Sequence, residues 1–127
     1  MSRVVLDASA VLAMLNEEPG GDEVASTIPG AVLGTVNLSE VIAKLTENGM
    51  PEEVVRLAMT AIELEIHPFD EALAYEAGTL RATTKSLGLS FGDRACLALG
   101  KRLGLPVLTT DRRWADLKAG FEVRLIR

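Results

Sequence analysis

Short apolar runs alternate with longer amphipathic segments along the chain, and this alternation is the main indication of its fold. The apolar runs predict strands at residues 3–7, 31–35, 64–68, 105–109 and 121–126. Strands separated by helical segments are typical of an α/β domain with a parallel sheet. No repeat, low-complexity tract or linker interrupts the pattern, so we expect a single domain over residues 1–127.

The segments between the predicted strands carry helix signals. Residues 37–48 have apolar side chains at helical spacing and end at an Asn-Gly pair, and Pro51 suits the first position of the next helix. Helices are predicted at 8–15, 22–28, 37–48, 51–62, 70–85 and 91–104, with a short turn or helix at 111–117. Every predicted strand but the last is therefore followed by helical chain, as parallel strands require.

Composition narrows the classes of site that the chain can hold. With 127 residues, 48% hydrophobic and 24% charged, it has the profile of one globular core. Cys96 and His67 are the sole cysteine and the sole histidine, which excludes an intramolecular disulfide and a Cys/His structural zinc site within one chain. Asp7 interrupts the apolar N-terminal run, so we expect no membrane span and a soluble, cytoplasmic protein.

Four carboxylates, each at the start of a predicted helix, are the candidate functional residues: Asp7, Glu40, Asp93 and Asp111. Asp7 and Asp111 stand at the ends of two short apolar strand segments, VVLD and PVLTTD. The carboxyl ends of parallel strands form one edge of a sheet, where ligands bind, so these acids are expected to gather there. A cluster of oxygen ligands suits a hard divalent cation, Mg²⁺ or Mn²⁺.

Each acid also has a simpler interpretation as a helix cap. Asp7 and Asp111 are suitable N-cap residues. Glu40 stands three residues after Asn37, and Asp93 three residues after Ser90, which is the spacing of a capping box. As a group they are harder to explain by capping, because like charges at one edge of a sheet repel unless a cation is present.

The chemistry follows from the residue types that the candidate site contains. An acid-only site has no base next to a nucleophile, as Ser-His-Asp or Cys-His mechanisms need, and the chain has no Gly-rich nucleotide loop. Water activated by a metal ion remains, which points to phosphoester chemistry. The net charge of −5 argues against broad electrostatic binding of nucleic acid, but Arg112 and Arg113 flank Asp111 and are the preferred candidates for phosphate contact.

Four segments in this order resemble a PIN domain and, within that superfamily, the VapC-type toxins of prokaryotic toxin–antitoxin pairs. The segments are VVLDASAVLAML, NLSEVIAKL, LSFGDRACLALGKRLGLPVLTTD and DRRW. The resemblance implies a three-layer α/β/α sandwich with a central parallel five-stranded sheet. It also implies an Mg²⁺- or Mn²⁺-dependent endoribonuclease, in which metal-activated water cleaves RNA phosphodiesters.

The resemblance further implies a set of site residues and partners. The catalytic and metal-binding acids are Asp7, Glu40, Asp93 and Asp111, and the supporting or phosphate-binding residues are Ser9, Thr109, Thr110, Arg112 and Asp116. A cognate VapB-like antitoxin and a homodimer are expected. Candidates for an exposed apolar surface that an antitoxin helix could cover are Leu57, Met59, Ile62 and Leu80, with ordinary core packing as the alternative.

A non-catalytic function is the main alternative. The chain would then be a catalytically silent PIN-like module that docks RNA or protein. The complete set of acids argues against it, because a scaffold has no reason to keep charges that repel. A phosphoacceptor receiver domain is a weaker alternative, because the first strand ends on Asp7 alone and no lysine follows the last strand.

Overall fold

A computed structural model describes residues 3–117 and 120–127 and shows a five-stranded sheet in which all strands are parallel. The strand order is β3-β2-β1-β4-β5. The strands are β1 (Val5–Leu6), β2 (Val32–Gly34), β3 (Glu65–His67), β4 (Val107–Thr109) and β5 (Val123–Leu125). The predicted parallel five-stranded sheet is confirmed.

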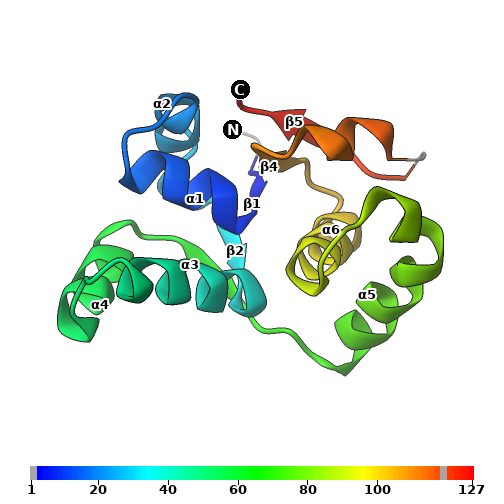
Figure 1. The fold of residues 1–127 in the computed structure, drawn as a ribbon, viewed down its shortest axis with the longest axis horizontal. Helices are drawn as coiled ribbons and strands as arrows, with labels where there is room; N and C mark the ends of the chain where they lie inside the picture. Colours follow the sequence, from blue (N-terminus) through cyan, green and yellow to red (C-terminus); the bar gives the residue numbers. More distant parts are fainter. Residues whose placement is uncertain (1–2, 118–119) are drawn as a thin grey trace.

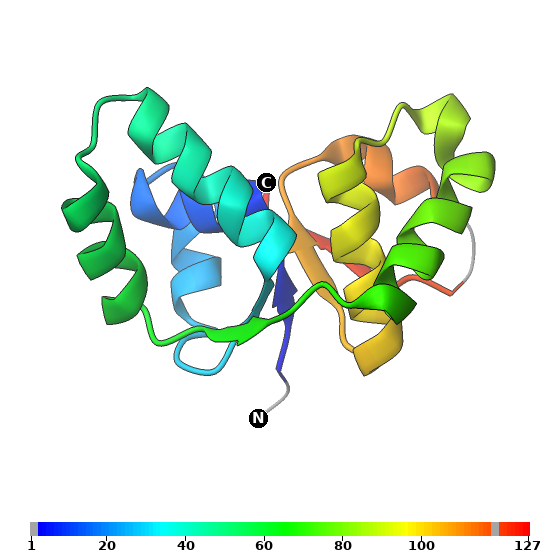
Figure 2. The same ribbon diagram turned by 90° about the horizontal axis from the view of Figure 1, so that it is seen from below.

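Helices cover both faces of the sheet and make three layers (Figures 1 and 2). One face carries α1 (Ala8–Leu15), α2 (Gly21–Ala25), α3 (Thr35–Glu47) and α4 (Glu52–Ala61). The other carries α5 (Glu71–Thr84), α6 (Phe91–Leu103) and the short 3-10 helix η2 (Arg112–Asp116), and a 3-10 turn η1 (Lys85–Leu87) follows α5. The predicted α/β/α sandwich is therefore confirmed.

The three inner strands β2, β1 and β4 bury both of their faces, and this explains their continuous apolar runs. Leu6 packs toward α1–α4, whereas its neighbour Val5 packs toward α5 and α6. Leu33 and Val32 divide in the same way. Successive side chains of a strand point to opposite faces, so an inner strand between two helical layers needs apolar residues at every position.

Local signals placed most element boundaries within a few residues, with one informative exception. Helix α3 begins at Thr35, directly after Gly34, rather than near Asn37. Asn37 is consequently inside the helix, and the Asn37–Glu40 capping box is wrong. The Ser90–Asp93 capping box is confirmed: the Ser90 hydroxyl accepts from the Asp93 amide and the Asp93 carboxylate accepts from the Ser90 amide.

The chain changes direction across the sheet between β1 and β4. Strands β2 and β3 lie on one side of β1, and the chain then crosses to place β4 on the other side. Ligands of open α/β sheets bind at such a switch point, outside the carboxyl ends of the strands. Asp7 follows β1 and Asp111 lies two residues after β4, so the fold brings both acids to this point. Within the two described ranges, no helix is long and apolar enough to cross a bilayer.

Candidate metal centre

A cleft of about 390 Å³ at the switch point contains all four predicted acids. Its lining is Asp7, Ala8, Ser9, Leu12, Asn37, Glu40, Lys44, Asp93, Thr110 and Asp111. These residues come from β1–α1, α3, α6 and the loop after β4. The sequence-based expectation that acids distant along the chain lie together is borne out by this geometry.

Asp7 is held rigidly at the floor of the cleft. It is 5% exposed, and it caps α1 by accepting a hydrogen bond from the amide of Ala10. The hydroxyl of Ser9 donates to Oδ1 and the hydroxyl of Thr109 donates to Oδ2, both at 2.7 Å. Asp7 can therefore serve both as the N-cap of α1 and as a residue of the site, because the carboxylate that caps the helix also lines the cleft.

Each of the two hydroxyls connects Asp7 to the loop after β4. Ser9 Oγ accepts from the amide of Thr110 at 3.1 Å, and Thr109 Oγ1 accepts from the amide of Asp111 at 3.0 Å. Since these amides can only donate, each hydroxyl proton is directed at Asp7. The pair therefore sets the position of the Asp111 loop relative to Asp7.

Burial raises the pKa of Asp7 to about 6, although the hydrogen bonds from Thr109, Ser9 and Ala10 oppose it, and the negative charge of Asp93 raises it further. A carboxyl with such a pKa is poorly stabilised as an anion at neutral pH. A cation in the cleft would supply the missing stabilisation.

Glu40 lines the same cleft from α3. Asn37, one turn earlier, donates from Nδ2 to Glu40 Oε1 at 2.8 Å and to the carbonyl of Gly92 at 3.1 Å. Partial burial raises the pKa of Glu40, the hydrogen bond from Asn37 lowers it, and the charge of Asp93 raises it. Asn37 therefore positions Glu40 and ties α3 to the first turn of α6.

Gly92 leaves the space into which the Glu40 carboxylate fits. A Cβ at position 92 would lie 2.3 Å from Glu40 Oε2 and 2.5 Å from Oε1. Real Cβ contacts are never so short, so any larger residue would push the carboxylate away. The first turn of α6 thus contributes Asp93 to the cleft and, at the preceding residue, room for the acid of α3.

Asp93 and Asp111 differ from the other two acids because an arginine lies beside them. Arg113 Nε donates to Asp111 Oδ1 at 3.0 Å and to Oδ2 at 3.1 Å, and Nη2 lies 3.6 Å from Asp93 Oδ2. The Arg113 guanidinium holds the pKa of Asp111 below its usual value, against partial burial. Of the four acids, Asp93 and Asp111 are therefore paired with an arginine. Among the side chains that the structure describes, Asp7 and Glu40 are not.

The side chains fit a hydrated hard cation better than a bare one. In the part of the chain that the structure describes, no three acidic, histidine or cysteine side chains come close enough together to hold an ion directly. Mg²⁺ usually keeps several waters and takes one or two carboxylates directly, which a cleft of this size allows. Burial is the larger cause of the raised pKa values of Asp7 and Glu40, and the negative charge of Asp93 raises both further.

The remaining predicted residues divide into those that line the cleft and those that do not. Thr110 lines it, whereas Arg112 and Asp116 are exposed on η2 and are absent from the lining. Lys44 lines it and was not predicted. Its position one helical turn after Glu40 was a usable signal, because residues four apart lie on one helix face.

The single histidine and the single cysteine lie outside this cleft. Cys96 is fully buried, as its position between apolar residues indicated, and burial raises the pKa of its thiol well above the usual value. His67 is the last residue of β3 and is not part of the cleft lining. The site therefore offers carboxylates, hydroxyls, one amide and one lysine, a set suited to a hard cation and a phosphate.

Comparison with protein families gives one match. The model of the PIN domain matches residues 4–120. The search among curated proteins found no match.

Solved structures with a similar fold include proteins of toxin–antitoxin systems. The DNA-bound VapBC of Salmonella typhimurium is 20% identical, with 100% of both chains covered and a TM-score of 0.75. A toxin–antitoxin complex from Klebsiella pneumoniae is 16% identical, with 98% of each chain covered and a TM-score of 0.76. VapBC-5 of Mycobacterium tuberculosis is 26% identical over 100% of this chain and 99% of that one, with a TM-score of 0.67.

Proposed function

This chain belongs to the PIN domain family, and from that premise we propose that it is the VapC-type ribonuclease toxin of a toxin–antitoxin pair. The observation that carries the proposal is the gathering of Asp7, Glu40, Asp93 and Asp111 in one cleft at the switch point of the sheet. The similarity to solved toxin–antitoxin structures supports it. The reaction would be hydrolysis of RNA phosphodiesters.

The residues of the cleft would each contribute a distinct part of the reaction. A bound Mg²⁺ or Mn²⁺ would lower the pKa of water and neutralise charge on a phosphodiester. Asp7 would hold the ion from a fixed position, because three hydrogen bonds fix its carboxylate. Glu40 would face it from α3, oriented by Asn37. Two basic residues would contact phosphates of the RNA. Lys44 lines the cleft, and Arg112 on η2 follows Asp111, which also lines it.

A catalytically silent binding module is the alternative, and the electrostatics of the cleft count against it. Burial and the charge of Asp93 raise the pKa values of both Asp7 and Glu40. Such an arrangement costs stability at neutral pH, as linkage requires for an acid whose pKa is raised on folding. A purely structural scaffold gains nothing from that cost, whereas a site for a divalent cation does.

Cleavage of a mixed cellular RNA pool tests the proposed activity. Purified protein, freed of any antitoxin, is expected to produce discrete cuts with Mg²⁺ or Mn²⁺ and none with EDTA. Asp93→Asn keeps an oxygen that can accept from the Ser90 amide but removes one charge from the cleft, so it is expected to lose the cuts while remaining folded. Metal-loaded, folded protein that binds RNA without cutting it would favour the silent module instead.

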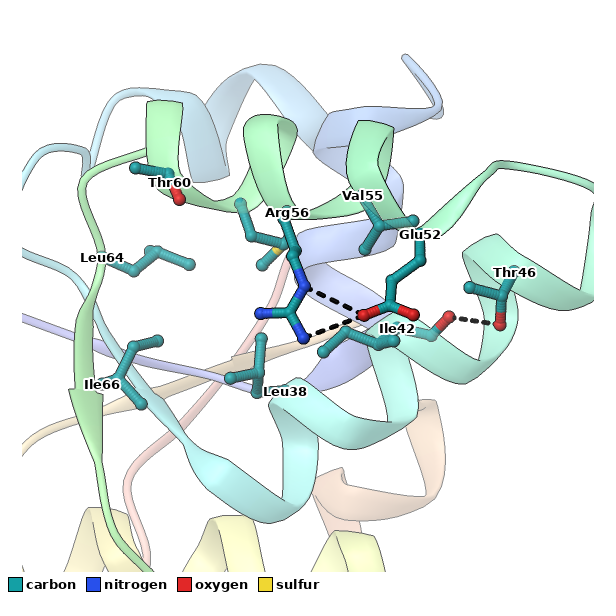
Figure 3. Close-up of a pocket in the computed structure, with 10 residues that line it drawn as sticks. Leu38, Ile42, Thr46, Glu52, Val55, Arg56, Thr60, Leu64 and Ile66 are labelled. Carbon is teal, nitrogen blue, oxygen red and sulfur yellow. Dashed lines mark hydrogen bonds and ion pairs between the residues drawn. The ribbon is translucent and has the colours of Figure 1, made fainter.

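An apolar groove on the α3–α4 side is the surface that we propose for a VapB-like antitoxin (Figure 3). It has a volume of about 560 Å³ and lies between α3, α4 and β3. The apolar residues that line it are Leu38, Ile42, Val55, Met59, Leu64 and Ile66. Arg56 and Glu52 form an ion pair at 2.9 Å beside them. An amphipathic helix can bury its apolar face in a groove of this kind.

The four residues predicted for an exposed apolar surface take different positions. Met59 lines the groove, and Leu57 is 72% exposed on the same helix. Ile62 is partly buried at the end of α4, and Leu80 packs in the core on the opposite face of the sheet. The core interpretation is therefore the better one for Leu80. The homodimer remains a prediction.

The groove can be tested with a matched pair of edge-strand variants. Ile66 on β3 is 43% exposed and lines the groove, whereas Leu125 on β5 is 38% exposed at the other edge of the sheet. Ile66→Glu is expected to weaken binding of the cognate VapB-like antitoxin by about tenfold or more, the effect of leaving a charge at an apolar contact. Leu125→Glu is expected to bind normally in the same titration calorimetry. Equal losses in both would place the antitoxin elsewhere.

A further inference from the structure

Arg113 forms a network of contacts with two acids of the cleft. Its backbone amide donates to Asp111 Oδ1 at 3.0 Å, and its Nε and Nη2 donate to the same carboxylate. Nη2 also pairs with Asp93. Nη1 donates to the carbonyls of Leu87 and Gly88, at 3.0 and 3.1 Å. One guanidinium therefore bridges η2, the η1 turn and the first turn of α6.

These contacts occupy the oxygens that would otherwise face a cation. Asp111 Oδ1 accepts from the amide and from Nε of Arg113, and Oδ2 accepts from Nε and Nη2. Asp93 Oδ2 accepts from the amide of Ser90 and faces Arg113. The positive charge of the guanidinium lies where the positive charge of an ion would stabilise the same two carboxylates. An ion that uses Asp111 must consequently compete with Arg113.

We propose that Arg113 is an internal counter-cation of the metal centre, which pairs with Asp111 and Asp93 in the metal-free protein and must release Asp111 before a divalent cation binds fully. This deepens the proposed function, on which it rests, by naming a residue that regulates occupancy of the same cleft. The carbonyls of Leu87 and Gly88 hold the guanidinium at the edge of the cleft in a direction that a lysine ammonium, with a single charged point, would not reproduce.

The affinity for Mn²⁺, measured by titration calorimetry or electron paramagnetic resonance without RNA, tests the competition. Arg113→Ala removes the competing cation and is expected to lower the dissociation constant about threefold to tenfold, the range for a half-exposed ion pair. Arg112→Ala is the matched control. It removes the same charge from the neighbouring residue, and among the described side chains Arg112 forms no ion pair with Asp93 or Asp111. Its effect is expected to be smaller than twofold.

A second measurement is made on wild-type protein, and a variant serves only to assign the resonance. In wild-type protein, the Nε–H resonance of Arg113 is expected to shift as diamagnetic Mg²⁺ is added, because its carboxylate partner is taken. Arg113→Lys identifies the resonance. Arg56 is the internal reference, because its Nε donates to Glu52 at 3.0 Å in the α3–α4 groove, outside the cleft, and its resonance is expected to stay unchanged.

The outcomes separate this inference from the proposed activity. Tighter Mn²⁺ binding in Arg113→Ala than in Arg112→Ala supports the competition between Arg113 and the cation. This holds even if the protein cuts no RNA, because absence of cleavage overturns only the proposed nuclease activity. Weaker binding in Arg113→Ala would show that Arg113 orients the ligands, and equal effects of the two variants would show only a general charge effect. Either result, or an Arg113 resonance that is insensitive to Mg²⁺, overturns the competition.

Discussion

Asp7→Asn is expected to remove nearly all RNA cleavage and, without metal, to shift the pH dependence of stability in favour of the variant. Asp7 lies at the floor of the cleft with three hydrogen bonds and 5% exposure. Replacing residues that only orient a metal ligand typically costs 10–100-fold in affinity or activity, so loss of this acid is expected to cost at least about 100-fold. Asparagine can still cap α1.

The stability effect follows from the raised pKa of Asp7. The pKa is about 6 in the folded protein against 3.8 for an ordinary Asp. Below pH 3.8 the carboxyl is protonated in both folded and unfolded states. Between pH 4 and 6 the unfolded chain loses the proton first, so the folded state loses stability as the pH rises through this window. At 1.36 kcal/mol per pKa unit, the loss above pH 6 is about 3 kcal/mol as an upper bound.

Chemical denaturation in EDTA at pH 4, 5, 6 and 7 measures this effect. The stability of Asp7→Asn relative to wild type is expected to rise across the window and to level off above pH 6. The asparagine side chain has one acceptor oxygen in place of two, so one of the hydrogen bonds from the Ser9 and Thr109 hydroxyls is lost. This loss costs about 1 kcal/mol of stability, and the cost is the same at every pH. Adding Mg²⁺ at pH 7 should stabilise wild type alone. A pH-independent difference would mean that Asp7 has an ordinary pKa.

Gly92→Ala is expected to lower the rate of RNA cleavage at least about tenfold while leaving the fold nearly unaffected. The new methyl group would occupy the place of the Glu40 carboxylate, 2.3 Å from Oε2. Glu40 is the end of a flexible side chain, so it can swing out, but it would then leave the hydrogen bond from Asn37. Alanine also favours a helix over glycine by about 1 kcal/mol, which offsets the local rearrangement.

Gly78→Ala is the matched control for that variant. Gly78 lies within α5, and a Cβ there would meet nothing within 4 Å. It is expected to stabilise the protein by about 0.5–1 kcal/mol with full activity. Glu40→Gln combined with Gly92→Ala should be no worse than Glu40→Gln alone, because both act on one carboxylate. Full activity of Gly92→Ala in single-turnover cleavage would show that Glu40 does not act from this position.

Several sequence expectations succeeded because their signals are local. The Ser90–Asp93 capping box formed because both partners lie within one turn of chain and need nothing from elsewhere. Asn37 and Glu40 have equivalent spacing but formed no cap, because α3 begins directly at the end of β2. The same two residues instead interact inside the helix, with Asn37 also bound to Gly92. Spacing alone therefore could not distinguish a cap from a side-chain pair that serves the site.

The sequence by itself determined the order of strands and helices and indicated the four acids as candidate site residues, since apolar periodicity and helix-start residues act over a few positions. Only the tertiary structure decided that β1 lies between β2 and β4, that Gly92 makes room for Glu40, and that Arg113 pairs with two of the acids. These features depend on contacts between elements far apart along the chain. Their energies come from packing and charge in three dimensions, which no local pattern of residues records.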